Sequence, residues 1–83
     1  MNDTVTFAVF EHFLHGLGFT QGTVPDSHVY YEHPASGTVI MARLHRPQDL
    51  VPWHTFVSAR QTLVGRGLVT PEAFDQLLQA AVA

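Results

Sequence analysis

The side chains best suited to proton transfer in this chain are its six histidines. Imidazole is the only unperturbed side chain that changes charge near neutral pH, so a histidine can take or give a proton there. His28 opens a segment, residues 28–33, in which alternate side chains face opposite sides of a strand. His28, Tyr30 and Glu32 share the side that suits a ligand. From this pattern alone, His28 is either a group for proton transfer or a surface histidine without a chemical role.

Metal binding has little support in the spacing of the histidines. His12 and His15 are three residues apart and share a helix face, as a two-histidine site requires, but no third ligand is set by spacing. A solvated polar face explains this pair better. His28 and His33 are five residues apart, so they face opposite sides of a regular strand. The chain has no cysteine, which excludes disulfides and thiolate sites. We therefore expect no metal and no cofactor.

The positive charge is confined to one part of the chain. The net charge is −3, yet residues 43–66 hold all four arginines and one acid, and are locally +3. Polyanion binding depends on neutralising phosphates, so this segment can bind RNA through Arg43 and Arg46, with His45 and His54 adding charge when protonated. The alternative is that the arginines lie over a small core or pair with acids. We find no phosphate-binding loop, paired catalytic carboxylates or nucleophile elbow.

Aromatic residues and the scarcity of charge suggest binding surfaces. Tyr30 and Tyr31 can stack on the bases of single-stranded RNA, although one of the two belongs to the core. Trp53 either packs across the sheet or anchors a partner. Only 13% of the residues are charged, where about 25% is usual. Either uncharged polar residues and histidines keep this surface hydrated, or another protein or a second copy covers part of it.

The first part of the chain is expected to form one helix and three strands. Apolar residues at helical spacing predict a helix from about Thr4 to Leu17, capped by Asp3 or Thr4 and ended by Gly16 or Gly18. Strands are predicted over residues 19–24, 28–33 and 38–44. Gly22 indicates a bulge or kink in the first strand.

Two helices are expected in the remainder. One begins near Pro52 and ends at Gly65 or Gly67, and the last has Thr70 as its cap and Pro71 at its first position. The 83 residues therefore form a single α+β domain in the order α, β, β, β, α, α. No basic segment precedes a long apolar run, so we predict no signal peptide, no membrane span and a cytoplasmic location.

In order and spacing, these elements resemble the small HicA-type toxins of bacterial toxin–antitoxin systems. LGF at residues 17–19 resembles the end of that family's first helix, and SHVYYEHP at residues 27–34 resembles its Ser-His strand and His-Pro turn. SARQTLVGRGLVTPEAFDQLL at residues 58–78 is similar to its closing pair of helices. The resemblance implies a three-stranded antiparallel sheet backed by helices, as in a double-stranded-RNA-binding domain.

The resemblance also implies an activity. HicA-type toxins are small metal-independent ribonucleases that act on mRNA, and the histidine of their Ser-His strand, here His28, acts at the scissile phosphate. Arg43, Arg46, Tyr30 and His45 are then the candidate RNA contacts. The implied partner is an antitoxin protein of the HicB type that covers the His28 face.

A second interpretation belongs to a different class. Asp26 stands where the family usually has glycine, and Arg43 stands about where it has a proline. Together with the absence of lysine and the sparsely charged surface, these departures suit a protein interface better than a polyanion. The alternative is therefore a non-catalytic module of the same fold that forms a homo-oligomer or a protein complex.

Overall fold

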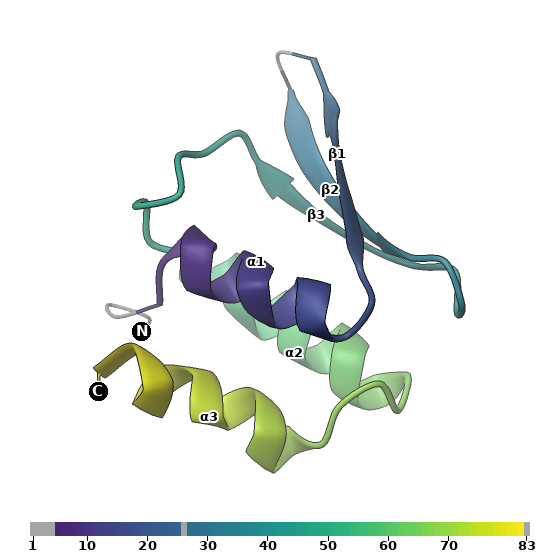
Figure 1. The fold of residues 1–83 in the computed structure, drawn as a ribbon, viewed down its shortest axis with the longest axis vertical. Coiled ribbons are helices and arrows are strands. Elements are labelled where there is room, and N and C mark those ends of the chain that lie inside the picture. The colour runs from purple at the N-terminus through teal and green to yellow at the C-terminus, as the bar shows by residue number, and fades with distance from the viewer. Residues whose placement is uncertain (1–4, 26, 83) are drawn as a thin grey trace.

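The computed structural model describes residues 5–25 and 27–82 and confirms an α+β domain with one three-stranded antiparallel sheet (Figure 1). The order along the chain is also the predicted one. Its elements are α1 (Phe7–Gly16), β1 (Thr20–Val24), β2 (His28–His33), β3 (Thr38–Arg43), α2 (Trp53–Gly65) and α3 (Pro71–Val82).

The strands pair in sequence order, β1-β2-β3, with β2 in the centre. Val29 and Tyr31 of β2 point to one face and are buried, while His28 and Glu32 point to the other and are exposed. The prediction of a bulge at Gly22 is wrong, because Gly22 pairs in regular register with Tyr30, and a kink there stays a prediction. The Tyr30 ring lies against this position, so a Cβ atom there would force the ring to shift.

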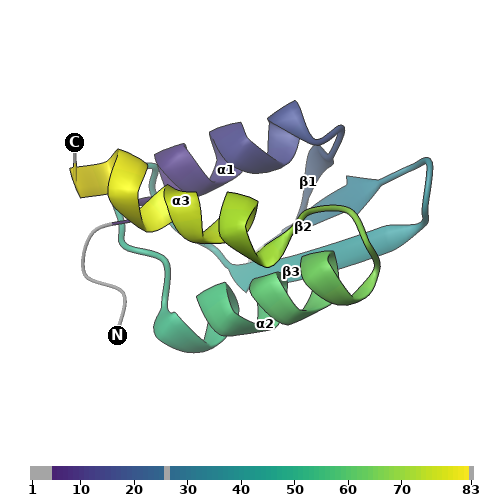
Figure 2. The ribbon, with the colours of Figure 1, turned by 90° about the horizontal axis from the view of Figure 1, so that it is seen from below.

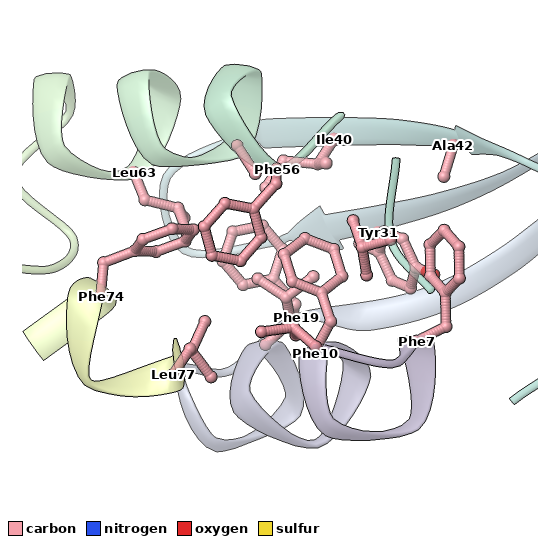
Figure 3. Close-up of a cluster of buried hydrophobic side chains, with 14 of the residues drawn as sticks. Phe7, Phe10, Phe19, Tyr31, Ile40, Ala42, Phe56, Leu63, Phe74 and Leu77 are labelled. Atoms are coloured by element: carbon pink, nitrogen blue, oxygen red, sulfur yellow. The ribbon is translucent and has the colours of Figure 1, made fainter. Parts of the chain in front are cut away.

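All three helices lie on one side of the sheet (Figure 2). Helices α1 and α2 pack against the buried face, and α3 lies across both of them on the side away from the strands. Phe74 of α3 reaches into the core, where its ring contacts those of Phe13 and Phe56. The core is therefore built from aromatic side chains of every helix together with apolar residues of β2 and β3 (Figure 3).

The first helix begins later than predicted. Its N-cap is Thr6, whose hydroxyl accepts a hydrogen bond from the Val9 N–H at 3.4 Å. The predicted caps Asp3 and Thr4 lie outside the described residues. Thr6 is extended and forms a β-bridge with Leu50, so this pairing holds the chain out of the helix. The predicted end is confirmed, because Gly18 has a φ of 99°, which favours glycine.

The closing helices follow the predicted signals. Helix α2 begins at Trp53, directly after Pro52, and its end is followed by Gly67 with a φ of 72°. The hydroxyl of Thr70 accepts a hydrogen bond from the Ala73 N–H at 3.1 Å, which is the expected cap of α3. Across the described residues, none of the helices is both long enough and apolar enough to cross a membrane.

Candidate functional site

The side of the sheet away from the helices is uncovered, and we call it the open face. The register arranges its side chains in three rows across the strands. One end row contains the basic side chains, the middle row contains Tyr30, and the other end row contains Glu32. From the basic end, the rows are Val24, His28 and Arg43; Gly22, Tyr30 and Met41; and Thr20, Glu32 and Val39.

His28 is exposed at the basic end of the open face. It pairs in register with Arg43 on β3, so both side chains leave the same side of the sheet next to each other. The Ser27 hydroxyl is hydrogen-bonded to His28 Nδ1. If Nδ1 donates to Ser27, then Nε2 is the nitrogen left to accept a proton. Ser27 therefore orients the ring and can select its tautomer.

A groove runs from the basic end of the open face to the first turn of α2. His28 and Arg43 line it from the sheet, and His54 lines it from the helix. Helix α2 has no side-chain cap and no acid in its first turn, so its free N–H groups and the positive end of its dipole remain available there. The complete lining is His28, Met41, Ala42, Arg43, His54, Thr55 and Ser58.

An adjoining groove shares Arg43 and His54 but contains a carboxylate, that of Asp49. Asp49 accepts a hydrogen bond from the Arg46 backbone N–H at 2.9 Å and lies 3.4 Å from the Arg46 guanidinium. The backbone hydrogen bond, followed by the charge of Arg46, lowers the pKa of the Asp49 carboxyl. This negative charge disfavours phosphate, which makes the His28 groove the better anion site.

The four arginines thus lie in different environments. Arg46 pairs with Asp49 and lines neither groove. Arg60 makes two hydrogen bonds to Asp75 of α3, at 2.8 and 3.1 Å, on the helical side of the molecule. Arg66 follows the end of α2. Arg43 is the arginine that shares a groove with His28, and it makes no ion pair within the described part of the chain.

The two tyrosines of β2 have different surroundings. Tyr30 is half-buried on the open face, where its ring lies over Gly22 of β1. Tyr31 is fully buried in the core, with its ring edge-on to Phe10 at 6.1 Å between centroids. Tyr30 is therefore the tyrosine available for stacking on a base, and Tyr31 is the one that belongs to the core.

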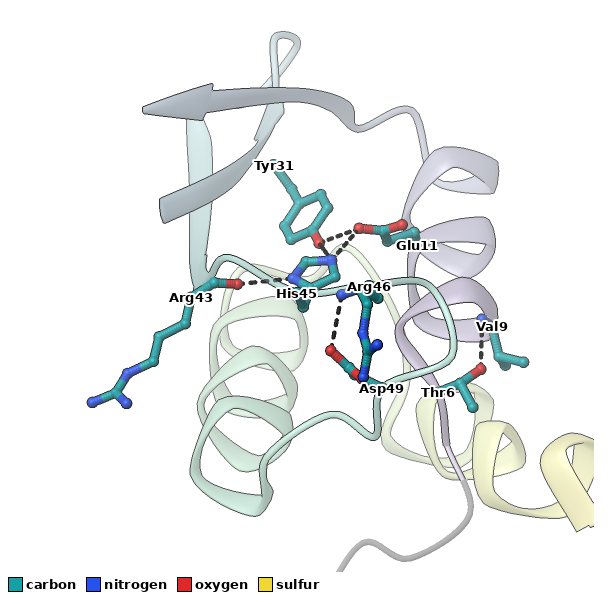
Figure 4. A network of polar contacts seen from close by, with 8 residues as sticks. All are labelled: Thr6, Val9, Glu11, Tyr31, Arg43, His45, Arg46 and Asp49. Carbon is teal, nitrogen blue, oxygen red and sulfur yellow. Dashed lines mark hydrogen bonds and ion pairs between the residues drawn. The ribbon is translucent and has the colours of Figure 1, made fainter. Parts of the chain in front are cut away.

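His45 lies inside the molecule, in a network with Glu11 and Tyr31 (Figure 4). One carboxylate oxygen of Glu11 lies 2.6 Å from the Tyr31 hydroxyl and 2.8 Å from His45 Nε2. The His45 ring is stacked on Phe7 at 3.5 Å, and its Nδ1 lies 2.8 Å from the Arg43 carbonyl oxygen. A carbonyl and a carboxylate both accept, so the ring can donate from both nitrogens when it is protonated, and its contact with Glu11 is then an ion pair.

This network removes His45 from the candidate RNA contacts. Only 7% of its side chain is exposed, and both ring nitrogens are occupied. Burial, then the hydrogen bond to Glu11 and its negative charge, raise the pKa of the Tyr31 hydroxyl above its usual range. The network holds the segment after β3 against α1, and Figure 4 shows the Arg43 side chain pointing away from it.

The remaining histidines and Trp53 have ordinary structural surroundings. His12 and His15 are exposed on α1, and the described residues contain no cluster of three possible metal ligands. His33 Nε2 donates to the Leu17 carbonyl oxygen at 3.1 Å, which ties β2 to the end of α1. Trp53 stacks on Phe56 of its own helix at 5.9 Å between ring centroids and is 45% exposed, so its anchoring of a partner stays a prediction.

Comparison of the chain with protein-family models, with curated proteins and with solved structures finds no match.

Proposed function

We propose that this chain is a HicA-like toxin with a double-stranded-RNA-binding-like fold, a small metal-independent ribonuclease that acts on mRNA. An antitoxin of the HicB type would neutralise it by covering the open face. The observation that carries the proposal is the register pairing of exposed His28 with Arg43, in one groove with His54. Proton-transfer groups and a phosphate-binding cation thereby meet on an accessible surface.

The chemistry uses the 2′-hydroxyl of RNA as an internal nucleophile. His28 Nε2 takes the proton of this hydroxyl while the 2′-oxygen attacks phosphorus, and the bond from phosphorus to the 5′-oxygen breaks. His54, when protonated, returns a proton to the leaving 5′-oxygen from the helix side of the groove. The mechanism uses the tautomer in which His28 Nδ1 donates to the Ser27 hydroxyl and Nε2 accepts.

Charge in the groove supports phosphate binding. The guanidinium of Arg43 can bind two phosphate oxygens, and the uncapped first turn of α2 adds N–H donors. Arg46 is 75% exposed, so its pair with Asp49 is weak and a phosphate at the margin of the site can displace it. Tyr30 offers the aromatic surface on which a base next to the cleaved bond can stack.

Induced expression in bacteria tests the proposal. The wild-type chain should arrest growth and degrade transcripts, and His28→Ala should abolish both while the protein stays folded by circular dichroism. Loss of one acid–base group costs about 10²- to 10⁴-fold in rate, which is enough to remove toxicity. His12→Ala is the matched control, because His12 is an exposed histidine on α1. Equal toxicity of the His28→Ala variant would remove His28 from the mechanism.

The exposed apolar side chains of the open face favour a second candidate function. Met41 and Val39 are 53% and 50% exposed next to Tyr30. A non-catalytic module that binds protein through this face would use these residues and would have no measurable affinity for RNA at low salt. Such a protein should not arrest growth, and substitution of His28 should leave growth unchanged.

A further inference from the structure

The open face has an apolar centre that no part of the described chain covers. Tyr30 and Met41 occupy its middle row, and Val24 and Val39, which are 43% and 50% exposed, lie at opposite corners. At Gly22 of β1, which has no side chain, the Tyr30 ring lies against the strand. A partly apolar sheet face can pack against another sheet at about 10 Å.

The charges on this face are arranged so that they complement themselves. His28 and Arg43 lie in one end row, and Glu32 lies in the other. Glu32 is four positions from His28 along β2, which is about 13 Å in a strand, so Glu32 and the basic end row do not neutralise each other within one molecule. They meet when a second copy is turned end for end over the first.

We propose that the open face binds the open face of a second copy, with a two-fold axis that runs between the sheets and across the strands at the Tyr30–Met41 row. This axis exchanges the two end rows. Glu32 of each copy then lies over His28 of the other, beside Arg43, while Tyr30 and Met41 meet their own counterparts at the centre. A closed two-fold contact of this kind is the commonest symmetry of soluble oligomers.

The same charge pattern argues for a second copy over other occupants. A uniformly acidic protein surface laid over the whole open face would be attracted by Arg43 but repelled by Glu32 at the other end row, whereas an identical surface satisfies both ends. The face consists of three short strands, so the contact is at the small end of specific interfaces and the dimer should be weak, with a micromolar dissociation constant. This inference names the partner of the second candidate function and rests on that function alone, not on RNA cleavage.

Sedimentation of the purified chain from about 1 µM to 1 mM, without RNA, tests the proposal. The wild type should pass from monomer to dimer. Glu32→Arg and Arg43→Glu should each raise the dissociation constant at least about tenfold, because like charges then meet at both symmetric contacts. Arg66→Glu is the matched control and should leave the constant unchanged, since Arg66 lies beyond the end of α2.

Mixing the two single variants gives the sharpest result. The arginine introduced at position 32 of one variant would meet the glutamate introduced at position 43 of the other. At the other symmetric contact, the unchanged Glu32 of one variant would meet the unchanged Arg43 of the other, as in the wild type. The mixture should therefore form a heterodimer with near wild-type affinity. A wild-type monomer at about 1 mM, or a mixture that does not associate, would overturn the proposal. Both outcomes concern self-association only, so the ribonuclease proposal is judged separately by the growth assay.

Discussion

Substitution of Glu11 should be among the most damaging changes available in this domain. A carboxylate oxygen of Glu11 lies 2.8 Å from His45 Nε2, with 15% and 7% of the two side chains exposed, and Tyr31 donates to the same oxygen. Truncation at Glu11 leaves the Tyr31 hydroxyl and the His45 ring buried without the carboxylate that both contact, which costs about 1 to 3 kcal/mol for each group. For 83 residues the whole stability is about 4 to 12 kcal/mol.

We therefore expect Glu11→Ala to be marginally folded or unfolded at 25 °C, and Glu11→Gln to lose about 1 to 2 kcal/mol. The amide oxygen of glutamine still accepts a hydrogen bond, but hydrogen bonds to a charged group are roughly twice as strong as neutral ones. Urea denaturation followed by circular dichroism measures both free energies of unfolding. The control is Glu72→Ala, which removes an exposed acid from the first turn of α3 and should cost about 1 kcal/mol or less.

The refuting result is a loss of less than about 1 kcal/mol for Glu11→Ala. Exposed ion pairs have energies of that size, so such a value would mean that water reaches the network and that His45 is not held in the interior. His45 Nδ1 would then no longer fix the Arg43 carbonyl, and the position of Arg43 beside His28 would depend on the strand pairing alone.

Two further predictions concern Tyr31 and Arg43. The raised pKa of Tyr31 gives stability that is fully present below the usual tyrosine pKa of about 10 and declines as pH rises above it, by up to about 1.4 kcal/mol per pH unit. Unfolding measured between about pH 9 and pH 11 should show this fall in the wild type, and its persistence in Tyr31→Phe would assign it to another group. If RNA phosphates contact Arg43 and at most one other arginine, a plot of log affinity for RNA against log salt concentration should have a slope of about −0.7 to −1.4. Fluorescence anisotropy should show that Arg43→Ala reduces this slope. Arg60→Ala should leave it unchanged, because the Arg60 guanidinium of the wild type is bound to Asp75. A steeper wild-type slope would mean that more than two arginines contact phosphate.

Local pattern was sufficient to predict most of the framework. Alternation along β2 separated Tyr31 from His28, and hydroxyl, proline and glycine signals gave the cap of α3 at Thr70 and the left-handed turn at Gly18. Each of these features depends only on residues a few positions away, so the local sequence pattern is sufficient to predict it. The pattern could not give the start of α1, since Thr6 is held extended by Leu50, which is far along the chain.

The sequence by itself determined the order of the elements, the side of the sheet on which His28 stands and the confinement of positive charge to residues 43–66. Only the tertiary structure decided which of those charges line the groove beside His28. His45 is buried because Glu11, 34 residues earlier, reaches it, and Arg60 is turned to the helical side because Asp75 lies there. Which residues meet over such distances in sequence depends on how the helices pack on the sheet, and the local spacing of residues does not reveal that packing.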